Sequence, residues 1–367
     1  MKIVQIIFAL GPGGAERFVT DLSNYLASDN EVYLCIICTE KVQSASFLKS
    51  DLNDQINYIN LGRKKGLNLK TFFSIFSLIK QIKPDVVHAH LNVLIYLYLP
   101  ALFYHKKVKF VHTLHSTASK AAGFKLQKQI NSFFYKRHIQ PVTISRDTKL
   151  SYEEFYGLNN SVLIVNGRDN LKKSLAFIDV SNEIEKYKNN SEDVVCVHIA
   201  RYDEAKNQEM LFEAFKTLIK QKNHLILMVL GAGFENGEGA KLKEKYKNYI
   251  YFLGPVQNVG DYLLCSDVFC LTSLWEGMPI SLLEAISCGI IPICTPAGGI
   301  PDVIIDGKYG YLSKDFSKDE YMNAINRYLK HPNQISKKSL KEYFQSNYSM
   351  KSCGNKYIKL YKNQYHD

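Results

Sequence analysis

Short apolar runs alternate with amphipathic stretches along almost the whole chain. In the first half, "KIVQIIFA" precedes a helical pattern from Ala15 to about Ser28, and "EVYLCIIC", "DVVHAH", "VKFVHTLH", "PVTIS" and "VLIVN" follow. In the second half the alternation restarts with "DVVCVHIA" and continues through "HLILMVLG", "YIYFLG", "DVFCLT" and "GIIPIC". Continuous apolar strands separated by helices predict parallel sheets that are covered on both faces.

The repeated pattern predicts an α/β protein with two doubly wound, Rossmann-like domains that face each other across a cleft. We expect domains over residues 1–170 and 193–345, joined by a linker over 171–192, which is polar and lacks a long apolar run. Residues 346–367 are expected to form a C-terminal helix that packs back toward the N-terminal domain. Ligands of such sheets bind beyond the carboxyl ends of the strands.

Composition narrows the class of protein. The chain has 367 residues, 46% hydrophobic and 22% charged, which is typical of a soluble globular protein of two domains. Its eight cysteines are scattered, mostly in apolar runs, which favours reduced thiols in a cytosolic protein. No cluster has metal-ligand spacing, so we expect no obligatory metal. The longest apolar run, Val93–Tyr104, is too short to span a bilayer.

The positive charge is unevenly distributed. The formal net charge is +11, and residues 1–170 carry +9 of it, with 21 Lys and Arg against 12 Asp and Glu. This asymmetry favours an anionic partner for the first half, such as phospholipid headgroups, a pyrophosphate-linked substrate or nucleic acid.

Two glutamates lie near a predicted helix start in "WEGMPISLLEAISCGIIPIC". Glu276 is expected in the loop after a strand, and Glu284 in the second turn of a helix among apolar residues. A buried carboxylate needs partners, and the vicinal hydroxyls of a ribose would supply them. The alternative is that Glu284 lies on a solvated face. The backbone N–H groups at this helix start would form an anion site at Ile280, Ser281 and Leu282.

Arg201 and Lys206 follow the strand "DVVCVHIA", where two permanent cations would neutralise a diphosphate without a metal. The alternative is an ordinary pair of surface charges at a helix start. Gly13 and Gly14 lie between the first strand and helix, where the backbone can approach a phosphate or sugar closely. Of the strand-end histidines, His115 is the last on its strand and is expected to face the cleft, whereas strand histidines in general are packed core residues.

These motifs together resemble the GT-B glycosyltransferases, specifically the retaining family GT4. The resemblance is strongest over residues 201–312, where "EGMPISLLEAISCGIIPICTPAGGIPDVIIDGKYGYL" matches the E-x7-E motif and the segment that follows it. The R-x4-K at Arg201 and Lys206, "GGAER" near the N-terminus and "VNG" at residues 165–167 also fit. Two departures stand out, Ala200 where the family has Gly, and "NGRDN" where it has the more apolar "NGVD" type.

The resemblance implies a role for each candidate residue. Glu284 would hold the nucleotide ribose, Arg201 and Lys206 the diphosphate, and Glu276 would lie beside the transferred sugar. The remaining candidates are expected to contact the donor: His115 at its sugar, Gly13 and Gly14 near its phosphates and the acceptor, and Gly277, Pro279, Ile280, Ser281 and Leu282 at the helix start. The C-terminal domain would then bind the nucleotide sugar and the N-terminal domain the acceptor.

The expected reaction moves a hexose or N-acetylhexosamine from a nucleotide sugar, UDP-linked, to a polyprenyl-diphosphate-linked glycan during bacterial surface polysaccharide synthesis (O-antigen or capsule). Nucleotide-sugar epimerases and sugar-phosphate synthases share this fold and remain alternatives, as does a nucleic-acid-binding module. No nucleic-acid partner is expected, because such a module has no need of Glu284 among apolar residues.

The basic first half also predicts peripheral attachment to an anionic membrane, on the cytoplasmic face. Two segments are candidates: "GRKKG" at residues 62–66, and "FKLQKQINSFFYKRH" at 124–138, in which cations alternate with aromatic residues. The alternative for the second segment is a solvated helix that packs its aromatic side chains inward. The cations expected to contact lipid there are Lys125, Lys128, Lys136 and Arg137.

Overall fold

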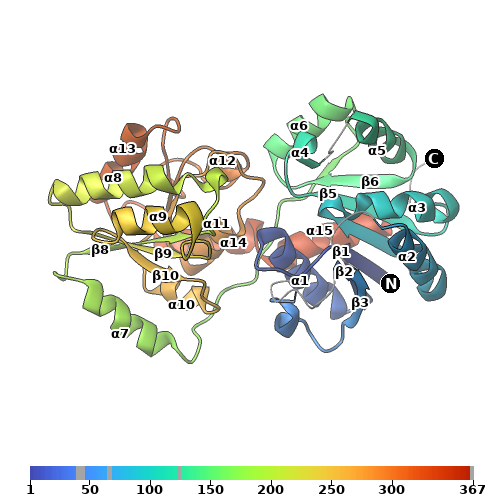
Figure 1. Cartoon of the computed structure of the whole chain (residues 1–367), viewed down its shortest axis with the longest axis horizontal. Coiled ribbons are helices and arrows are strands. Elements are labelled where there is room, and N and C mark those ends of the chain that lie inside the picture. The colour runs from blue at the N-terminus through green and yellow to red at the C-terminus, as the bar shows by residue number, and fades with distance from the viewer. Residues whose placement is uncertain (39–45, 64–67, 122–124, 364–367) are drawn as a thin grey trace. The chain divides into compact units, whose positions relative to one another are not determined.

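The computed structural model describes residues 1–38, 46–63, 68–121 and 125–363, and these form two compact units (Figure 1). The first unit contains Met1–Asp169 and Tyr348–Asp367, and the second contains Asn170–Asn347. Each unit is built on one parallel sheet with helices as crossovers. The predicted α/β class with two doubly wound domains is therefore confirmed.

The first unit has a seven-stranded sheet in the order β3-β2-β1-β4-β5-β6-β7. The strands are β1 (Lys2–Ile7), β2 (Glu31–Cys38), β3 (Asn57–Arg63), β4 (Val86–His90), β5 (Lys109–Leu114), β6 (Ile139–Thr143) and β7 (Val162–Leu163). The helices are α1 (Gly14–Ala27), η1 (Lys49–Asp51), α2 (Leu69–Ile82), η2 (Leu91–Leu97), α3 (Tyr98–Tyr104), α4 (Ala118–Ala121), α5 (Lys125–Arg137), α6 (Arg146–Tyr156) and α15 (Met350–Lys362).

The second unit has a six-stranded sheet in the order β10-β9-β8-β11-β12-β13. The strands are β8 (Val194–Ile199), β9 (Leu225–Leu230), β10 (Tyr251–Gly254), β11 (Val268–Leu271), β12 (Ile291–Cys294) and β13 (Tyr311–Leu312). The helices are α7 (Phe177–Tyr187), η3 (Glu204–Lys206), α8 (Gln208–Lys220), α9 (Gly237–Tyr246), α10 (Val259–Leu264), α11 (Ile280–Cys288), α12 (Ile300–Val303), α13 (Lys318–Lys330) and α14 (Lys337–Asn347).

Each sheet has one topological switch point, where the strand order changes direction. In the first sheet it lies between β1 and β4, and in the second between β8 and β11. The loops after these strands diverge to opposite faces of the sheet, which leaves a crevice at the carboxyl edge where ligands of such folds bind. The loops after β1, β8 and β11, together with the helices that directly follow them, contain all the candidate residues except His115.

The prediction of a linker over residues 171–192 was wrong. Residues 171–192 belong to the second unit and contain α7, which packs against α10. Val180 and Ile184 on this helix are buried. Phe177, Val180 and Ile184 recur at helical spacing, with polar residues between them. A search for continuous apolar runs therefore misses this amphipathic helix, because its apolar residues are spaced rather than adjacent.

The longest apolar run, Val93–Tyr104, does not form a single regular helix. It begins as the 3-10 stretch η2 and becomes α-helical only at Tyr98. Pro100 explains the change, because proline lacks an N–H and clashes with the carbonyl four residues earlier. It is tolerated in the first turn of α3, where its missing donor is not needed.

The C-terminal helix α15 completes the first unit, where it lies beside α1 and along the sheet (Figure 1). Arg168 holds the crossing point: its backbone N–H donates to Tyr348 O at 2.9 Å, and its guanidinium pairs with Asp21 of α1 at 2.6 Å. Both side chains of this ion pair are buried. The unusual arginine in "NGRDN" therefore supplies the cation for a carboxylate on α1.

We predict that Arg168→Ala lowers the free energy of unfolding by about 3–5 kcal/mol, because it removes the partner of a buried charge. The matched control is Arg327→Ala, which breaks an Arg–Asp pair of 2.9 Å whose side chains are nearly half exposed. That control should cost about 0–1 kcal/mol. Denaturant unfolding measures both, and equal losses in the two variants would contradict the structural role of Arg168.

Candidate functional site

The second sheet brings a lysine and a glutamate together at its switch point. Lys206 ends η3 after β8, and Glu276 lies in the loop after β11. Lys206 Nζ lies 2.6 Å from Glu276 Oε1, and the Ser273 hydroxyl donates to the same oxygen at 2.6 Å. The two charged side chains are 22% and 10% exposed, so the pair is partly shielded from solvent without being sealed. An ammonium has three N–H donors, and this lysine retains donors for an anionic ligand.

The backbone around this pair is held by short hydrogen bonds. The Thr272 hydroxyl at the end of β11 donates to Lys206 O at 2.9 Å, and the N–H of Leu274 donates to Ala205 O at 2.8 Å. The loop after β12 joins them, because the Thr295 hydroxyl donates to Ser273 O at 2.6 Å. Three loops from neighbouring strands therefore support the positions of Lys206 and Glu276.

Gly298 allows the third loop to approach Glu276. Its φ is +52°, and a Cβ at this position would lie 1.8 Å from Glu276 O. The next residue, Gly299, donates its N–H to Gly277 O at 3.0 Å. Glycine is thus required at position 298 by a close backbone approach.

Helix α11 begins three residues after Gly277, with Pro279 as its N-cap rather than its first residue. The first N–H groups of a helix have no intrahelical acceptor, so those of Ile280, Ser281 and Leu282 are available at this end. Leu282 is fully buried and Ile280 nearly so, whereas Ser281 is partly exposed. The anion site at this helix start stays a prediction.

Glu284 is buried in the second turn of α11, with 9% of its surface exposed. The alternative of a solvated face is therefore wrong. Its neighbours Leu283 and Ala285 are fully buried, and Glu284 is the only charged residue of this helix. Its role as a ribose ligand stays a prediction.

Arg201 differs from the other candidates. Its side chain is 75% exposed, and its guanidinium lies 3.2 Å from Asp203 Oδ2. Within the described residues it makes no ion pair with Glu276 and no contact with Lys206. The structure fixes its backbone instead, because Gln208 Nε2 donates to Arg201 O at 2.8 Å. Its contact with a diphosphate also stays a prediction.

The remaining candidates belong to the first unit. Gly13 is the N-cap of α1 and Gly14 its first residue, directly after the loop that follows β1. His115 follows β5 and is partly exposed, whereas His88, His90 and His112 are buried. Burial lowers the pKa of His115 to about 3 and that of His112 to about 4, so both are neutral at pH 7.

The sequence interpretation missed some of the residues that build these sites. Ser273 and Asp203 were not among the candidates, although a short polar residue after a strand or before a helix turn is a recognisable capping signal. His90, which lies beside His115 in the fold, is one of the strand histidines expected in the core, and its partner Gln5 was not among the candidates. Only the pairing of β1, β4 and β5 brings them together.

Among the residues with described positions, no group of three or more His, Cys, Asp or Glu is placed to hold a metal ion. The expectation of a metal-independent protein is still a prediction. Over the same part of the chain, no helix combines the length and the hydropathy needed to cross a bilayer. All eight cysteines are free thiols, as expected from their scattered apolar positions.

Two doubly wound parallel sheets in one chain define the GT-B class of glycosyltransferase folds. Residues 12–170 match the family model described as Glycosyltransferase Family 4, and residues 179–346 match the model described as Glycosyl transferases group 1. The chain therefore belongs to the GT4-like glycosyltransferases of the GT-B fold.

Proteins similar to this chain in sequence are named as glycosyltransferases. An uncharacterized glycosyltransferase of Methanocaldococcus jannaschii is 28% identical over 288 residues, 70% of each chain. The UDP-Gal:alpha-D-GlcNAc-diphosphoundecaprenol alpha-1,3-galactosyltransferase of Escherichia coli is 28% identical over 278 residues, 71% of this chain and 70% of that one. An alpha-1,4-N-acetyl-D-galactosaminyltransferase of Campylobacter jejuni, named for an undecaprenol-linked substrate, is 25% identical and covers 85% and 84% of the two chains.

Solved structures share the whole fold. Anabaena HepE, solved in complex with UDP-glucose, superposes with a TM-score of 0.79 over 98% of this chain and 99% of its own, at 17% identity. A glycosyltransferase from Rickettsia africae superposes with a TM-score of 0.82 over 98% and 97%, at 18% identity. At these identities the likeness establishes the fold.

We predict that Gly298→Ala lowers the free energy of unfolding by about 2–5 kcal/mol, because the methyl group adds a backbone clash to an unfavourable φ. Gly254→Ala is the matched control, since its φ is +73° and a Cβ there meets nothing within 4 Å. The control should cost about 1–2 kcal/mol for the backbone conformation alone. Similar losses in both variants, measured by denaturant unfolding, would refute the close approach.

Proposed function

We propose that this protein is a retaining glycosyltransferase that moves a hexose or N-acetylhexosamine from a UDP-linked sugar to a polyprenyl-diphosphate-linked glycan. The observation that carries the proposal is the Lys206–Glu276 ion pair at the switch point of the second sheet, three residues before the N-cap of α11. It combines a cation for a diphosphate with a carboxylate for a sugar at the edge where such folds bind ligands.

The proposal assigns separate ligands to the diphosphate and to the ribose of the donor. Lys206, Arg201 and the first N–H groups of α11 neutralise the diphosphate. Glu284 accepts hydrogen bonds from the vicinal hydroxyls of the ribose. The relatives named above support a nucleotide-sugar donor, since one is named for UDP-Gal and another was solved with UDP-glucose.

The chemical step requires stabilisation of the leaving group. The bond from the anomeric carbon to the diphosphate oxygen breaks, the acceptor hydroxyl oxygen bonds to that carbon, and its proton passes to the departing diphosphate. Negative charge grows on the diphosphate, so preorganised cations and N–H donors lower the barrier. Glu276 Oε2 makes no hydrogen bond within the described residues and is free to accept one from a sugar hydroxyl. His115, Gly13 and Gly14 stay predicted contacts of the donor.

We predict that Lys206→Ala and Arg201→Ala each reduce turnover by about 10²–10³-fold, because each removes charge stabilisation of the leaving group. Lys241→Ala is the control, since Lys241 is an exposed lysine of the same unit that pairs with Glu238. It should leave turnover unchanged. Release of UDP from UDP-glucose, UDP-galactose and their N-acetylhexosamine counterparts, with and without polyprenyl-diphosphate-linked sugar, measures the effect.

The products of this assay separate the alternatives. Transfer that depends on the lipid-linked sugar supports the proposal, and near-normal transfer in both variants rules out the diphosphate assignment. An isomerised nucleotide sugar without acceptor indicates an epimerase, and transfer to a sugar phosphate indicates a synthase. DNA binding that weakens with salt, without affinity for any nucleotide sugar, would instead indicate a nucleic-acid-binding module.

We also propose that the first unit attaches peripherally to an anionic membrane, on the cytoplasmic face where the lipid-linked acceptor would be reached. Residues 55–146 contain 15 Lys and Arg but only one acidic residue, Asp85. The net charge of this segment is therefore more positive than that of the whole chain, +11, so the rest of the protein has a small net negative charge. Helices α2, α3 and α5 all lie within it.

The proposed membrane-contacting surface includes α2 and α3 as well as α5. On α5, Phe134 and Tyr135 are buried, as the alternative of inward packing requires, whereas Phe133, Lys136 and Arg137 are exposed. Helices α2 and α3 pack against each other, and Tyr98 of α3 stacks on Phe134 of α5 at 4.4 Å. These two helices add exposed apolar side chains: Leu69, Phe73, Leu102 and Phe103.

We define the α2–α3–α5 surface by these exposed apolar side chains together with Lys70, Lys80, Lys106, Lys107, Lys136 and Arg137. Apolar residues bordered by cations suit the headgroup boundary of an anionic bilayer. The other candidate segment, "GRKKG", lies largely outside the described residues, since Lys64, Lys65 and Gly66 are not placed. The side chain of Lys125 is likewise not described, and Lys128 lies over the ring of Phe155.

We predict that the double reversal Lys136→Glu/Arg137→Glu weakens partitioning to phosphatidylglycerol vesicles at least about tenfold, because each basic residue near the surface contributes about 1 kcal/mol. The control, Lys241→Glu/Lys243→Glu, reverses two exposed charges of the second unit and should change little. Vesicle sedimentation measures both, with phosphatidylcholine vesicles as the neutral reference. Indifference of the first variant would count against membrane attachment through this surface.

A further inference from the structure

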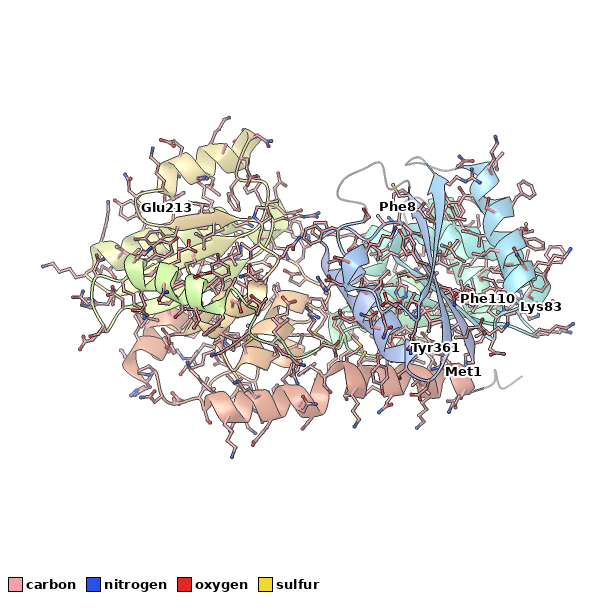
Figure 2. The ribbon with its side chains drawn as sticks, turned by 90° about the horizontal axis from the view of Figure 1, so that it is seen from below. Met1, Phe8, Lys83, Phe110, Glu213 and Tyr361 are labelled. Carbon is pink, nitrogen blue, oxygen red and sulfur yellow. The ribbon has the colours of Figure 1, made fainter. Side chains whose placement is uncertain are left out.

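A continuous chain of polar side chains crosses the first unit on the α1 and α15 side of its sheet. Gln5 of β1, His88 and His90 of β4, and Thr113 of β5 point to this side, together with His115 just beyond β5. Two tyrosines of α15, Tyr357 and Tyr361, cover them, and Tyr361 lies where this helix passes the sheet (Figure 2). All except His115 are fully buried or nearly so.

The chain is unbroken from Tyr357 to His115. Tyr357 OH lies 3.1 Å from Thr113 Oγ1, which lies 2.8 Å from His88 Nε2. His88 Nδ1 lies 2.7 Å from Tyr361 OH, which accepts from Gln5 Nε2 at 3.3 Å.

The remaining links lead to the exposed end. Gln5 Oε1 lies 2.7 Å from His90 Nε2, and His90 Nδ1 lies 3.1 Å from His115 Nε2. The ring of Phe18 on α1 packs edge-on against the imidazoles of His90 and His115 and limits their rotation.

The three histidines in this chain of hydrogen bonds, His88, His90 and His115, are neutral at pH 7. Burial lowers the pKa of His88 and of His90 well below the usual value, and that of His115 to about 3. A neutral imidazole has one N–H donor and one bare nitrogen acceptor. The hydrogen bond between His90 and His115 therefore needs an N–H donor from one ring and a bare nitrogen acceptor from the other. Which ring donates depends on the donors and acceptors earlier in the chain of hydrogen bonds.

The direction of the chain of hydrogen bonds is set at Gln5. Its amide oxygen, which can only accept, lies 2.7 Å from His90 Nε2, and its amide nitrogen, which can only donate, lies 3.3 Å from Tyr361 OH. If the phenol donates its single proton to His88, its oxygen must accept from the amide of Gln5. The amide oxygen of Gln5 then faces His90 and accepts its Nε2–H, which leaves His90 Nδ1 as an acceptor.

We propose that Gln5 and Tyr361 are positioning residues that act through His90 to hold His115 in its Nε2–H tautomer. His115 Nδ1, which makes no hydrogen bond within the described residues, then presents a lone pair to a ligand. Such a nitrogen accepts a hydrogen bond from a hydroxyl, whereas the other tautomer would offer an N–H donor. The ligand as a donor-sugar hydroxyl rests on the proposed function, but the tautomer does not.

The chain offers a matched pair of variants. Tyr361→Phe and Tyr357→Phe each remove one buried hydroxyl from the same helix, one turn apart, and keep the ring. The Tyr361 hydroxyl connects His88 to Gln5, whereas the Tyr357 hydroxyl, among the described residues, makes a hydrogen bond only to Thr113 at the far end of the chain of hydrogen bonds. A merely structural role predicts equal effects of the two changes, and a directional chain predicts an effect of Tyr361→Phe alone.

The test is the tautomer of His115, read from long-range proton–nitrogen spectra of the full chain labelled with ¹⁵N-histidine and assigned with His115→Gln. We expect the Nε2–H form in the wild-type protein and in Tyr357→Phe, and a mixture of both forms in Tyr361→Phe. Gln5→Met should give the same mixture. Thermal unfolding checks that the variants are folded. An Nδ1–H form in the wild-type protein, or an unchanged tautomer in Tyr361→Phe and Gln5→Met, overturns the inference.

Turnover of UDP-glucose and UDP-N-acetylglucosamine with a polyprenyl-diphosphate-linked acceptor provides the second measurement. We expect kcat/KM to fall about tenfold in Tyr361→Phe, because groups that orient a functional histidine have effects of this order. In Tyr357→Phe, kcat/KM should stay unchanged. If the tautomer responds as expected but neither nucleotide sugar is turned over by the wild-type protein, the inference stands and the proposed function fails.

Discussion

The carboxyl edge of each parallel sheet is the constraint on which the rest of the structure depends. Strands of one direction end at the same edge, and where the strand order reverses, the two following loops part and leave room for a ligand. In the second unit this point lies between β8 and β11, and the loops that start there contain Lys206 and Glu276. Hydrogen bonds from Thr272, Thr295 and Leu274 hold those loops together. The ion pair is therefore a product of sheet topology as much as of residue type.

The first unit uses its switch point differently. The interior there is polar, with a row of hydrogen-bonded side chains from α15 across β4 and β1 to His115. Each buried donor and acceptor in this row needs a partner, because an unmade hydrogen bond in the interior costs more than a made one contributes. The C-terminal helix thus completes the interior chemistry of the first unit as well as its packing, and Arg168 fixes the point where the chain returns to form it.

Charge is distributed in the same modular way. The segment from β3 to the start of α6 is almost free of acidic residues, yet its interior is a dense aromatic core that includes Phe72, Tyr96, Tyr98 and Phe134. Its outer helices combine exposed apolar and basic side chains, whereas the second unit is nearly neutral and balances its surface lysines with neighbouring glutamates. This composition, exposed apolar side chains bordered by cations, is the observation on which the proposed membrane attachment rests.

The sequence alone determined the class of fold, because continuous apolar strands between amphipathic helices pack stably only as covered parallel sheets. It also placed Glu284 among the apolar residues of a predicted helix, but it left open whether this carboxylate is buried or solvated, and the structure shows it buried. Local patterns did not reveal α7, whose apolar residues are spaced rather than contiguous, or the 3-10 start of the helix that contains Pro100. Only the tertiary structure decided that Lys206 pairs with Glu276 across seventy residues, that Arg201 stays exposed, and that Gln5 and Tyr361 lead to His115. Such contacts join residues far apart in the chain, and no short-range periodicity encodes which strands will be neighbours in a sheet.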